Sequence, residues 1–255
     1  MGSSALFWLG RALNEKPPPR LLLLTNDDGW DAPGLEALGQ ASAGLGACRL
    51  VAPDGAYSGC GHRVTTDRPI AFAVKNDLLT VVGGTPADCV RLALAQTTSR
   101  PAWILAGINR GGNLGTDVYH SGTVAAVREG AIRGIPGIAI SQYVARGRAL
   151  DWSVSARLAR LVIGRLLEGA WTPGTYWNVN LPHLDPDAPD PELVFCGLDP
   201  SPLPARYRLE GDQAHYEGDY QGRPRLPRRD VDVCFGGRIS ATRISVLEHD
   251  PRGES

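Results

Sequence analysis

The chain has 255 residues, of which 43% are hydrophobic and 21% are charged, and its formal net charge at pH 7 is −1. This composition is typical of a globular protein with one sizeable core, and it excludes a disordered chain. The near balance of charges argues against a nucleic-acid polymer as the main partner, because such a surface needs a basic excess. A small anionic ligand held by a few local groups remains compatible with it.

Cysteine usage and the amino-terminal segment bear on the cellular compartment. The five cysteines are scattered, odd in number and never spaced as Cys-x-x-Cys, so neither a disulfide framework nor a zinc site is indicated. The apolar stretch 5–9 is too short for a signal-peptide core or a membrane span. We therefore expect a cytoplasmic protein without membrane association, in which residues 1–19 form a leader outside a core domain at 20–255.

From residue 20 onward, apolar runs alternate with amphipathic stretches, which is the pattern of a βαβ progression. Four consecutive leucines at 21–24 predict a strand that is buried on both faces, as in a parallel sheet covered by helices. A capping threonine, Thr85, followed by proline and then Asp88, favours a helix that opens there. The pattern also predicts strands over 49–52, 70–74, 78–82, 103–106, 137–141 and 176–181, and helices over 34–47, from 121 and over 153–167.

The last third of the chain differs in composition. From 182 to 229, proline, aspartate, glycine and arginine are frequent and no helical period survives. We predict an extended arm or hairpin there, which packs on another subunit and forms no second core. The chain continues with a strand or short helix over 231–235 and a strand over 238–246.

Two adjacent carboxylates, Asp27 and Asp28, follow the first predicted strand. Ligands of open α/β sheets bind at the carboxyl ends of the strands, which makes this position a candidate site. Asparagine, aspartate and glycine also cluster in turns for backbone reasons, so the Asn-Asp-Asp-Gly run alone favours a simple turn. Further donors elsewhere in the chain must decide between the two.

A second polar cluster follows the strand predicted at 103–106. The loop at 107–115 is the most glycine-dense in the chain, and it contains Asn109 and Arg110. Glycines of this kind allow backbone N–H groups to face an anion, and the helix expected to begin at Ser121 is a second anion-binding device. The two features together predict a phosphate-binding region.

Oxygen donors at these strand ends suit a hard divalent cation such as Mg²⁺ or Mn²⁺. Asp27 and Asp28 offer carboxylates, while Asn109 and Ser58, the latter from the long polar loop after the second strand, offer an amide and a hydroxyl. A cation there would leave positions for water and a phosphate oxygen, activate the water and neutralise phosphoryl charge. With one carboxylate as general base, the set predicts hydrolysis of a phosphate ester.

Other interpretations remain open on these residues alone. The chain has no GxGxxG turn after the first strand and no GxxxxGK[ST] loop, Cys60 and His62 lack further ligands at zinc spacing, and His120 is either structural or substrate-facing. The alternative of another class is a non-catalytic magnesium-binding receiver-like or nucleotide-binding signalling module, although the expected phospho-acceptor aspartate is not in place. A haloacid-dehalogenase-type phosphatase needs Asp-x-Asp, whereas the two carboxylates here are adjacent.

Five sequence blocks occur in order along the chain: TNDDG (25–29) with APG (32–34), VAPD (51–54) with SG (58–59), GTPADCV (84–90), GIN (107–109) with NLG (113–115), and YHSGTVAA (119–126). Together they resemble the SurE family, the survival-protein 5′/3′-nucleotidases. The match is strong over about 20–141 and loose beyond. His62 stands where many members have asparagine, Arg63 follows it, Trp30 is bulky, and the arm matches least.

The resemblance implies a Rossmann-like three-layer α/β sandwich with a mostly parallel sheet and an extended C-terminal oligomerisation arm that joins homodimers or homotetramers. It implies a metal-dependent, acid-phosphatase-type activity on nucleoside 5′- and 3′-monophosphates, extending in some members to short polyphosphate, with one Mg²⁺, Mn²⁺ or Co²⁺ ion per subunit. Carried over by motif, the catalytic residues are Asp27 and Asp28, the metal ligands are Asp27, Asp28, Ser58 and Asn109, and the phosphate-binding residues are Asn113, Ser121, Gly122 and Thr123.

Overall fold

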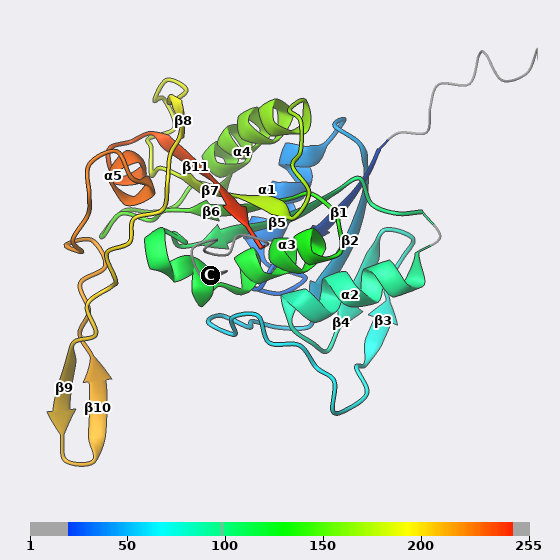
Figure 1. Cartoon of the computed structure of the whole chain (residues 1–255), viewed down its shortest axis with the longest axis horizontal. Helices are drawn as coiled ribbons and strands as arrows, with labels where there is room; N and C mark the ends of the chain where they lie inside the picture. The colour runs from blue at the N-terminus through cyan, green and yellow to red at the C-terminus, as the bar shows by residue number, and fades with distance from the viewer. Residues whose placement is uncertain (1–19, 98, 247–255) are drawn as a thin grey trace, which may run out of the picture.

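The computed structural model describes residues 20–97 and 99–246, so the leader expected at 1–19 lies outside the described residues. A nine-stranded sheet forms the centre, in the order β3-β4-β2-β1-β5-β6-β7-β11-β8 (Figure 1). Its strands are β1 (Leu21–Thr25), β2 (Ala47–Pro53), β3 (Phe72–Val74), β4 (Leu79–Val82), β5 (Trp103–Arg110), β6 (Gly137–Gln142), β7 (Thr175–Leu181), β8 (Leu193–Phe195) and β11 (Ile239–Ser245).

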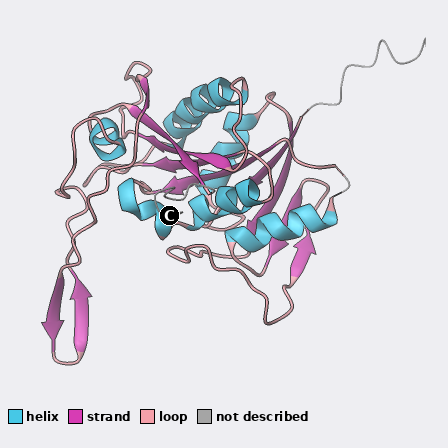
Figure 2. Cartoon of the chain, in the orientation of Figure 1, coloured by secondary structure: helices cyan, strands magenta, loops and turns pink. Residues whose placement is uncertain are grey.

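Helices cover both faces of the sheet (Figure 2). The neighbours β4, β2, β1, β5, β6 and β7 run parallel, whereas β3 and β11 run antiparallel to β4 and β7. This arrangement confirms the predicted α/β fold with a mostly parallel sheet. The helices are α1 (Pro33–Ser42), α2 (Pro86–Gln96), α3 (Gly122–Ile132), α4 (Trp152–Leu167) and α5 (Asp230–Phe235), with a short 3₁₀ helix at Gly115–Tyr119.

The four leucines of β1 show why the sheet needs helices on both sides. Leu22 and Leu24 pack into a core with α1 and α4, whereas Leu23 points to the opposite face and packs into a second core with α2 and α3. All three side chains are buried, because alternate residues of a strand face opposite sides of a sheet. The prediction of a strand buried on both faces is confirmed.

Helix α2 begins where its capping residues predict. The Thr85 hydroxyl accepts a hydrogen bond from the Asp88 N–H, and the Asp88 carboxylate accepts one from the Thr85 N–H at 3.0 Å, which completes a capping box. Pro86 occupies the first helical position, where the backbone N–H has no partner within the helix, so the N–H that proline lacks is not missed. Local chemistry therefore decides the start of this helix.

Two element boundaries differ from the sequence prediction. Helix α1 ends at Ser42 and not at 47, because Gly44 adopts φ +77° and residue 47 already begins β2. Strand β5 continues to Arg110, although 107–115 was expected to be a loop, because a bulge between Ala106 and Asn109 shifts the register against β6 and lets pairing resume.

The region 182–229 is only partly an arm. Strands β9 (Tyr207–Glu210) and β10 (Gln213–Tyr216) form an antiparallel hairpin that extends from the body (Figure 1), as predicted. In contrast, β8 pairs with β11 inside the main sheet, and the segments that flank the hairpin return to the body. The prediction of an extended arm or hairpin over 182–229 therefore does not hold for β8, which joins the edge of the main sheet. A strand of three residues has no local sequence pattern that would reveal this pairing.

Membrane crossing has no support from the helices. Among those found in residues 20–97 and 99–246, none combines the length and apolar character that a bilayer span requires.

Gly34 and Gly39 of α1 form a matched pair for testing the packing of α1 on β5. A Cβ on Gly34 would lie 2.0 Å from the carbonyl oxygen of Ile108, whereas a Cβ on Gly39 would meet no heavy atom within 4 Å. We expect Gly34→Ala to lower the free energy of unfolding by ~2 kcal/mol or more, because backbone must move. Gly39→Ala should raise it by ~0.5–1 kcal/mol through helix propensity. Chemical denaturation measures both, and equal stabilities would contradict the close approach.

Candidate active site

Asp27 is buried at the carboxyl end of β1. One of its carboxylate oxygens accepts a hydrogen bond from the hydroxyl of Thr123 on α3. Burial raises the pKa of Asp27 to about 6, the Thr123 hydrogen bond opposes this rise, and the neighbouring charge of Asp28 adds to it. A nearby positive charge would stabilise the ionised form of this buried carboxylate.

Asp28 and Asn109 lie at the same edge of the sheet, because β1 and β5 are parallel neighbours with Thr25 opposite Ala106. Burial raises the pKa of Asp28, and the backbone N–H and the guanidinium of Arg110 oppose that rise, so the carboxylate lies against the end of β5. The Asn109 side-chain amide donates from Nδ2 to the Gly111 carbonyl at 2.8 Å, which leaves its Oδ1 as an oxygen donor. Asn109 and the two carboxylates thus lie at the same edge of the sheet.

Ser58 approaches from the loop between β2 and β3. The N–H of its neighbour Tyr57 donates to the Asp27 carbonyl at 2.7 Å, and the N–H of Gly61 donates to the carbonyl of His120 at 3.1 Å. Ser58 itself is exposed, so its hydroxyl is accessible from solvent. The loop therefore lies between the end of β1 and the turn that precedes α3.

The amino end of α3 faces Asp27. Ser121 caps this helix, its hydroxyl accepting from the Val124 N–H at 3.0 Å, and the Thr123 N–H is directed to the Asp27 carboxylate. A Cβ on Gly122 would lie 2.9 Å from Cβ of Asp27 and 3.0 Å from the sulfur of Cys60, so only glycine fits here without a shift. Helix amides and dipole favour negative charge at this point.

Asn113 lies deeper than the other candidate phosphate-binding residues. Its side-chain amide donates to the Ser141 hydroxyl at 2.7 Å, and its own N–H donates to Oδ1 of Asn180 at 2.8 Å. The side chain of Asn178 in turn donates to the Asn113 carbonyl at 2.8 Å. These contacts fix the loop after β5 on the ends of β6 and β7, at the same edge of the sheet as Asp27.

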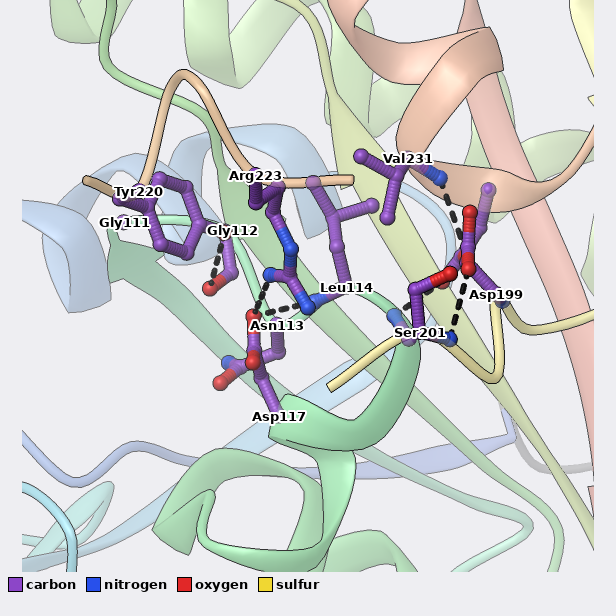
Figure 3. A network of polar contacts seen from close by, with 12 residues as sticks. Gly111, Gly112, Asn113, Leu114, Asp117, Asp199, Ser201, Tyr220, Arg223 and Val231 are labelled. Carbon is purple, nitrogen blue, oxygen red and sulfur yellow. Dashed lines mark hydrogen bonds and ion pairs between the residues drawn. The ribbon is translucent and has the colours of Figure 1, made fainter. Parts of the chain in front are cut away.

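Three residues from the segment after the hairpin hold the loop 111–120 from the other side (Figure 3). The Tyr220 hydroxyl donates to the Gly112 carbonyl at 3.1 Å, and Arg223 forms a 2.6 Å ion pair with Asp117. Asp230 accepts from the Gly115 N–H at 2.7 Å, and it also accepts from the Asp199 N–H at 2.7 Å. The loop that carries Asn113 is thus clamped between β7 and the C-terminal segment.

These clamping residues were not predicted from the sequence. Tyr220 and Arg223 stand in a stretch rich in arginine and proline, where no local pattern marks one residue from the next. Glu129 is a second omission: it is a buried carboxylate on α3 that pairs with His62. A single acidic residue within the small and apolar helix face of α3 was the available signal for it.

The residues with open roles lie around the site. His120 is exposed and contributes its backbone carbonyl to Gly61, while Arg63 is exposed with its carbonyl accepting from the Thr85 hydroxyl at 2.7 Å. The indole of Trp30 has the ammonium of Lys75 5.8 Å from its ring centroid, so it is engaged by a strand-end residue of the β3–β4 hairpin.

The donor chemistry of the site fits a hard cation. Within the described residues, no three His, Cys, Asp or Glu side chains are grouped to hold a metal ion, so any ion here would depend on mixed oxygen donors. Two adjacent carboxylates, the Asn109 amide oxygen and the exposed Ser58 hydroxyl are such a set, and cations of the Mg²⁺ type select it. The missing side chain of Gly122 allows the amino end of α3 to lie directly against Asp27 and Cys60.

The buried carboxylate of Asp230 predicts a pH dependence of stability. Burial raises its pKa from the usual 3.8 to about 6, although backbone N–H groups of Gly115, Asp199 and Val231 oppose the rise. The folded chain therefore holds this proton more strongly than the unfolded chain, and the free energy of unfolding should fall by ~3 kcal/mol from this group as the pH rises through that interval. Denaturation of wild-type and Asp230→Asn proteins at stepped pH measures it; the variant should lack this fall, and parallel pH profiles would contradict the assignment.

Known proteins share both the sequence and the fold of this chain. The family model described as Survival protein SurE matches residues 22–197. A protein of Nostoc sp. is 50% identical over 225 residues, which are 88% of this chain and 99% of its own length. The 5′-nucleotidase SurE of Heliobacterium modesticaldum is 44% identical over 241 residues, covering 90% of this chain and 85% of its own.

A solved structure supports the same relationship. The SurE protein from Aquifex aeolicus is 30% identical and superposes with a TM-score of 0.78, covering 91% of this chain and 96% of its own. This likeness confirms the α/β architecture. The five sequence blocks all fall within residues 22–197, which the family model matches. The chain belongs to the SurE family.

Proposed function

We propose that the chain is a phosphomonoesterase that hydrolyses nucleoside 5′-monophosphates to nucleoside and phosphate. The observation that carries this proposal is the contact between Asp27 and the amino end of α3, because it puts two carboxylates and an anion-binding helix end at one point. Relatives such as the Heliobacterium modesticaldum protein bear the name 5′-nucleotidase SurE, which supports a nucleotidase activity.

We further propose that activity depends on one divalent ion per subunit, Mg²⁺, Mn²⁺ or Co²⁺. Asp27, Asp28, Ser58 and Asn109 would hold it. When bound, such an ion lowers the pKa of water and offsets charge on the phosphoryl group. The raised pKa values of both aspartates support this proposal, since two carboxylates kept close together and out of water call for a cation.

The residues around the ion would divide the remaining tasks. The Ser121 hydroxyl and the first N–H groups of α3 would bind phosphate oxygens, and Gly122 allows this helix end to lie close to Asp27. Asn113 would shape the opposite wall. One carboxylate of the aspartate pair would accept the proton of the attacking water.

The substrate range would be wider than nucleoside 5′-monophosphates. Arg63 and Arg110 are both exposed at the rim of the site and would attract additional phosphate groups. On this ground we include nucleoside 3′-monophosphates and short-chain polyphosphate among the proposed substrates.

We propose that subunits associate as homodimers or homotetramers through the β9–β10 hairpin. Tyr207, Leu209 and Tyr216 on this hairpin are 57%, 76% and 50% exposed, which is more apolar surface than an isolated two-stranded ribbon keeps in water. A reducing cytoplasm is the proposed location, because the five cysteines are all free thiols.

Asp28→Asn tests the metal-dependent reaction. The variant keeps the shape of the side chain but removes a negative oxygen donor, so phosphate release from nucleoside monophosphates should be abolished and the rise in melting temperature on adding Mn²⁺ should disappear. Asp77→Asn changes an exposed residue in the turn between β3 and β4 that belongs to none of the proposed ligand sets, so this matched control should behave as wild type. Phosphate release should be assayed with Mg²⁺, Mn²⁺ and Co²⁺; activity that survives EDTA would show that the metal mechanism is wrong.

Replacing 205–218 by a short glycine-serine linker tests the proposed assembly. This deletion removes only β9 and β10 with their connection and keeps β8, Tyr220 and Arg223, so the body should stay folded. Static light scattering should report fewer subunits per particle than in the wild type, with an unchanged far-ultraviolet helix signal. An unchanged particle mass would remove the hairpin from the interface.

A further inference from the structure

His62 anchors the loop that carries Ser58, and we propose that it is a positioning residue for the candidate active site. Its imidazole reaches Glu129 on α3, with 2.9 Å between Nε2 and Oε2. This inference rests on the proposed function, because it concerns the placement of Ser58 beside Asp27 and Asp28. His62 itself would touch neither the ion nor the substrate.

Side-chain anchoring of this loop is sparse near Ser58. The connection 54–71 between β2 and β3 contains no helix or strand, and Gly59 and Gly61 adopt φ +71° and +57°. Backbone contacts at Tyr57 and Gly61 bracket Ser58. Between Ser58 and Thr65, His62 is the residue whose side chain bonds to a different element of the fold.

Glu129, the partner of His62, is a buried carboxylate that needs several hydrogen-bond donors. Its side chain is 4% exposed, and Arg91 at 3.3 Å and Arg133 at 2.7 Å also pair with it. Burial alone would raise the pKa of Glu129, but hydrogen bonds from His62 and Arg133 lower it below its usual value, so the carboxylate is ionised. An ionised acceptor needs the His62 Nε2 as an N–H donor, and removing a donor from a buried charge is costly.

The helix that bears Glu129 is the helix that supports Asp27. Thr123, whose hydroxyl bonds to Asp27, lies six residues before Glu129 on α3, about 9 Å along the helix axis. One rigid element therefore fixes Asp27 at its amino end and the Ser58 loop at its second turn. The tie sets the position of the hydroxyl donor relative to the carboxylates.

Arg133 supplies the matched control. It pairs with the same carboxylate from the C-cap position of α3, and its side chain is 40% exposed, so Arg133→Met weakens the Glu129 cluster without touching the loop. His62→Leu removes the tie, whereas His62→Gln keeps a side-chain N–H donor at comparable reach. A purely structural role for the cluster would give His62→Leu and Arg133→Met the same consequences.

The experiment measures loop exchange and ion binding in the full chain. Amide hydrogen exchange of metal-free protein should show faster exchange at 59–63 in His62→Leu, with wild-type rates in Arg133→Met and intermediate rates in His62→Gln. Calorimetric titration with Mn²⁺ should show a dissociation constant raised about 10-fold in His62→Leu, largely restored in His62→Gln and unchanged in Arg133→Met.

Two results would overturn the proposal. Equal amide hydrogen exchange rates at 59–63 in His62→Leu and wild type would show that the His62–Glu129 contact does not anchor the loop. A Mn²⁺ affinity that falls equally in His62→Leu and Arg133→Met shows a general loss of stability. If the wild-type protein binds no Mn²⁺, the proposed function fails, and the exchange rates at 59–63 then decide the anchoring role alone.

Discussion

The burial of the Asp27 carboxylate is the constraint on which the rest of the site depends. A charge removed from water is tolerated only where hydrogen-bond donors or an opposite charge compensate it. Here the compensation comes from the hydroxyl and N–H of Thr123 at the amino end of α3. That contact requires α3 to begin at this edge of the sheet, and it requires Gly122 to have no side chain.

A second layer of contacts keeps this arrangement in place from the far side. The loop 111–120 precedes α3, and it is held by Asn180 of β7 on one side and by Arg223 and Asp230 on the other. The Arg223 side chain in the ion pair with Asp117 is buried, so removing the Asp117 carboxylate would leave the Arg223 charge uncompensated inside the protein. The amino end of α3 therefore depends on residues about a hundred positions later in the chain. The C-terminal segment thus helps to position the candidate active site.

The parts of the fold that were predictable from the sequence are those with a local physical cause. The strand β1 follows from its four consecutive leucines, and the start of α2 follows from the capping box of Thr85 and Asp88. The placement of Asp27 and Asn109 at one edge of the sheet follows from the parallel pairing of β1 and β5. The extension of β5, the pairing of β8 and the ties from Arg223 and Glu129 depend on distant partners, and no local pattern encodes them.

The two halves of the candidate site are held in different ways. Asp27, Asn109 and the end of α3 belong to the sheet and a packed helix, whereas Ser58 belongs to an irregular connection. Elements of regular structure hold side chains more accurately than loops do, so the loop half needs its own tie to the rigid half. His62 in this loop supplies such a contact, because its imidazole reaches a carboxylate on the same helix that supports Asp27. A change at that position can therefore alter the placement of Ser58 while the carboxylates and the anion-binding helix end stay where they are.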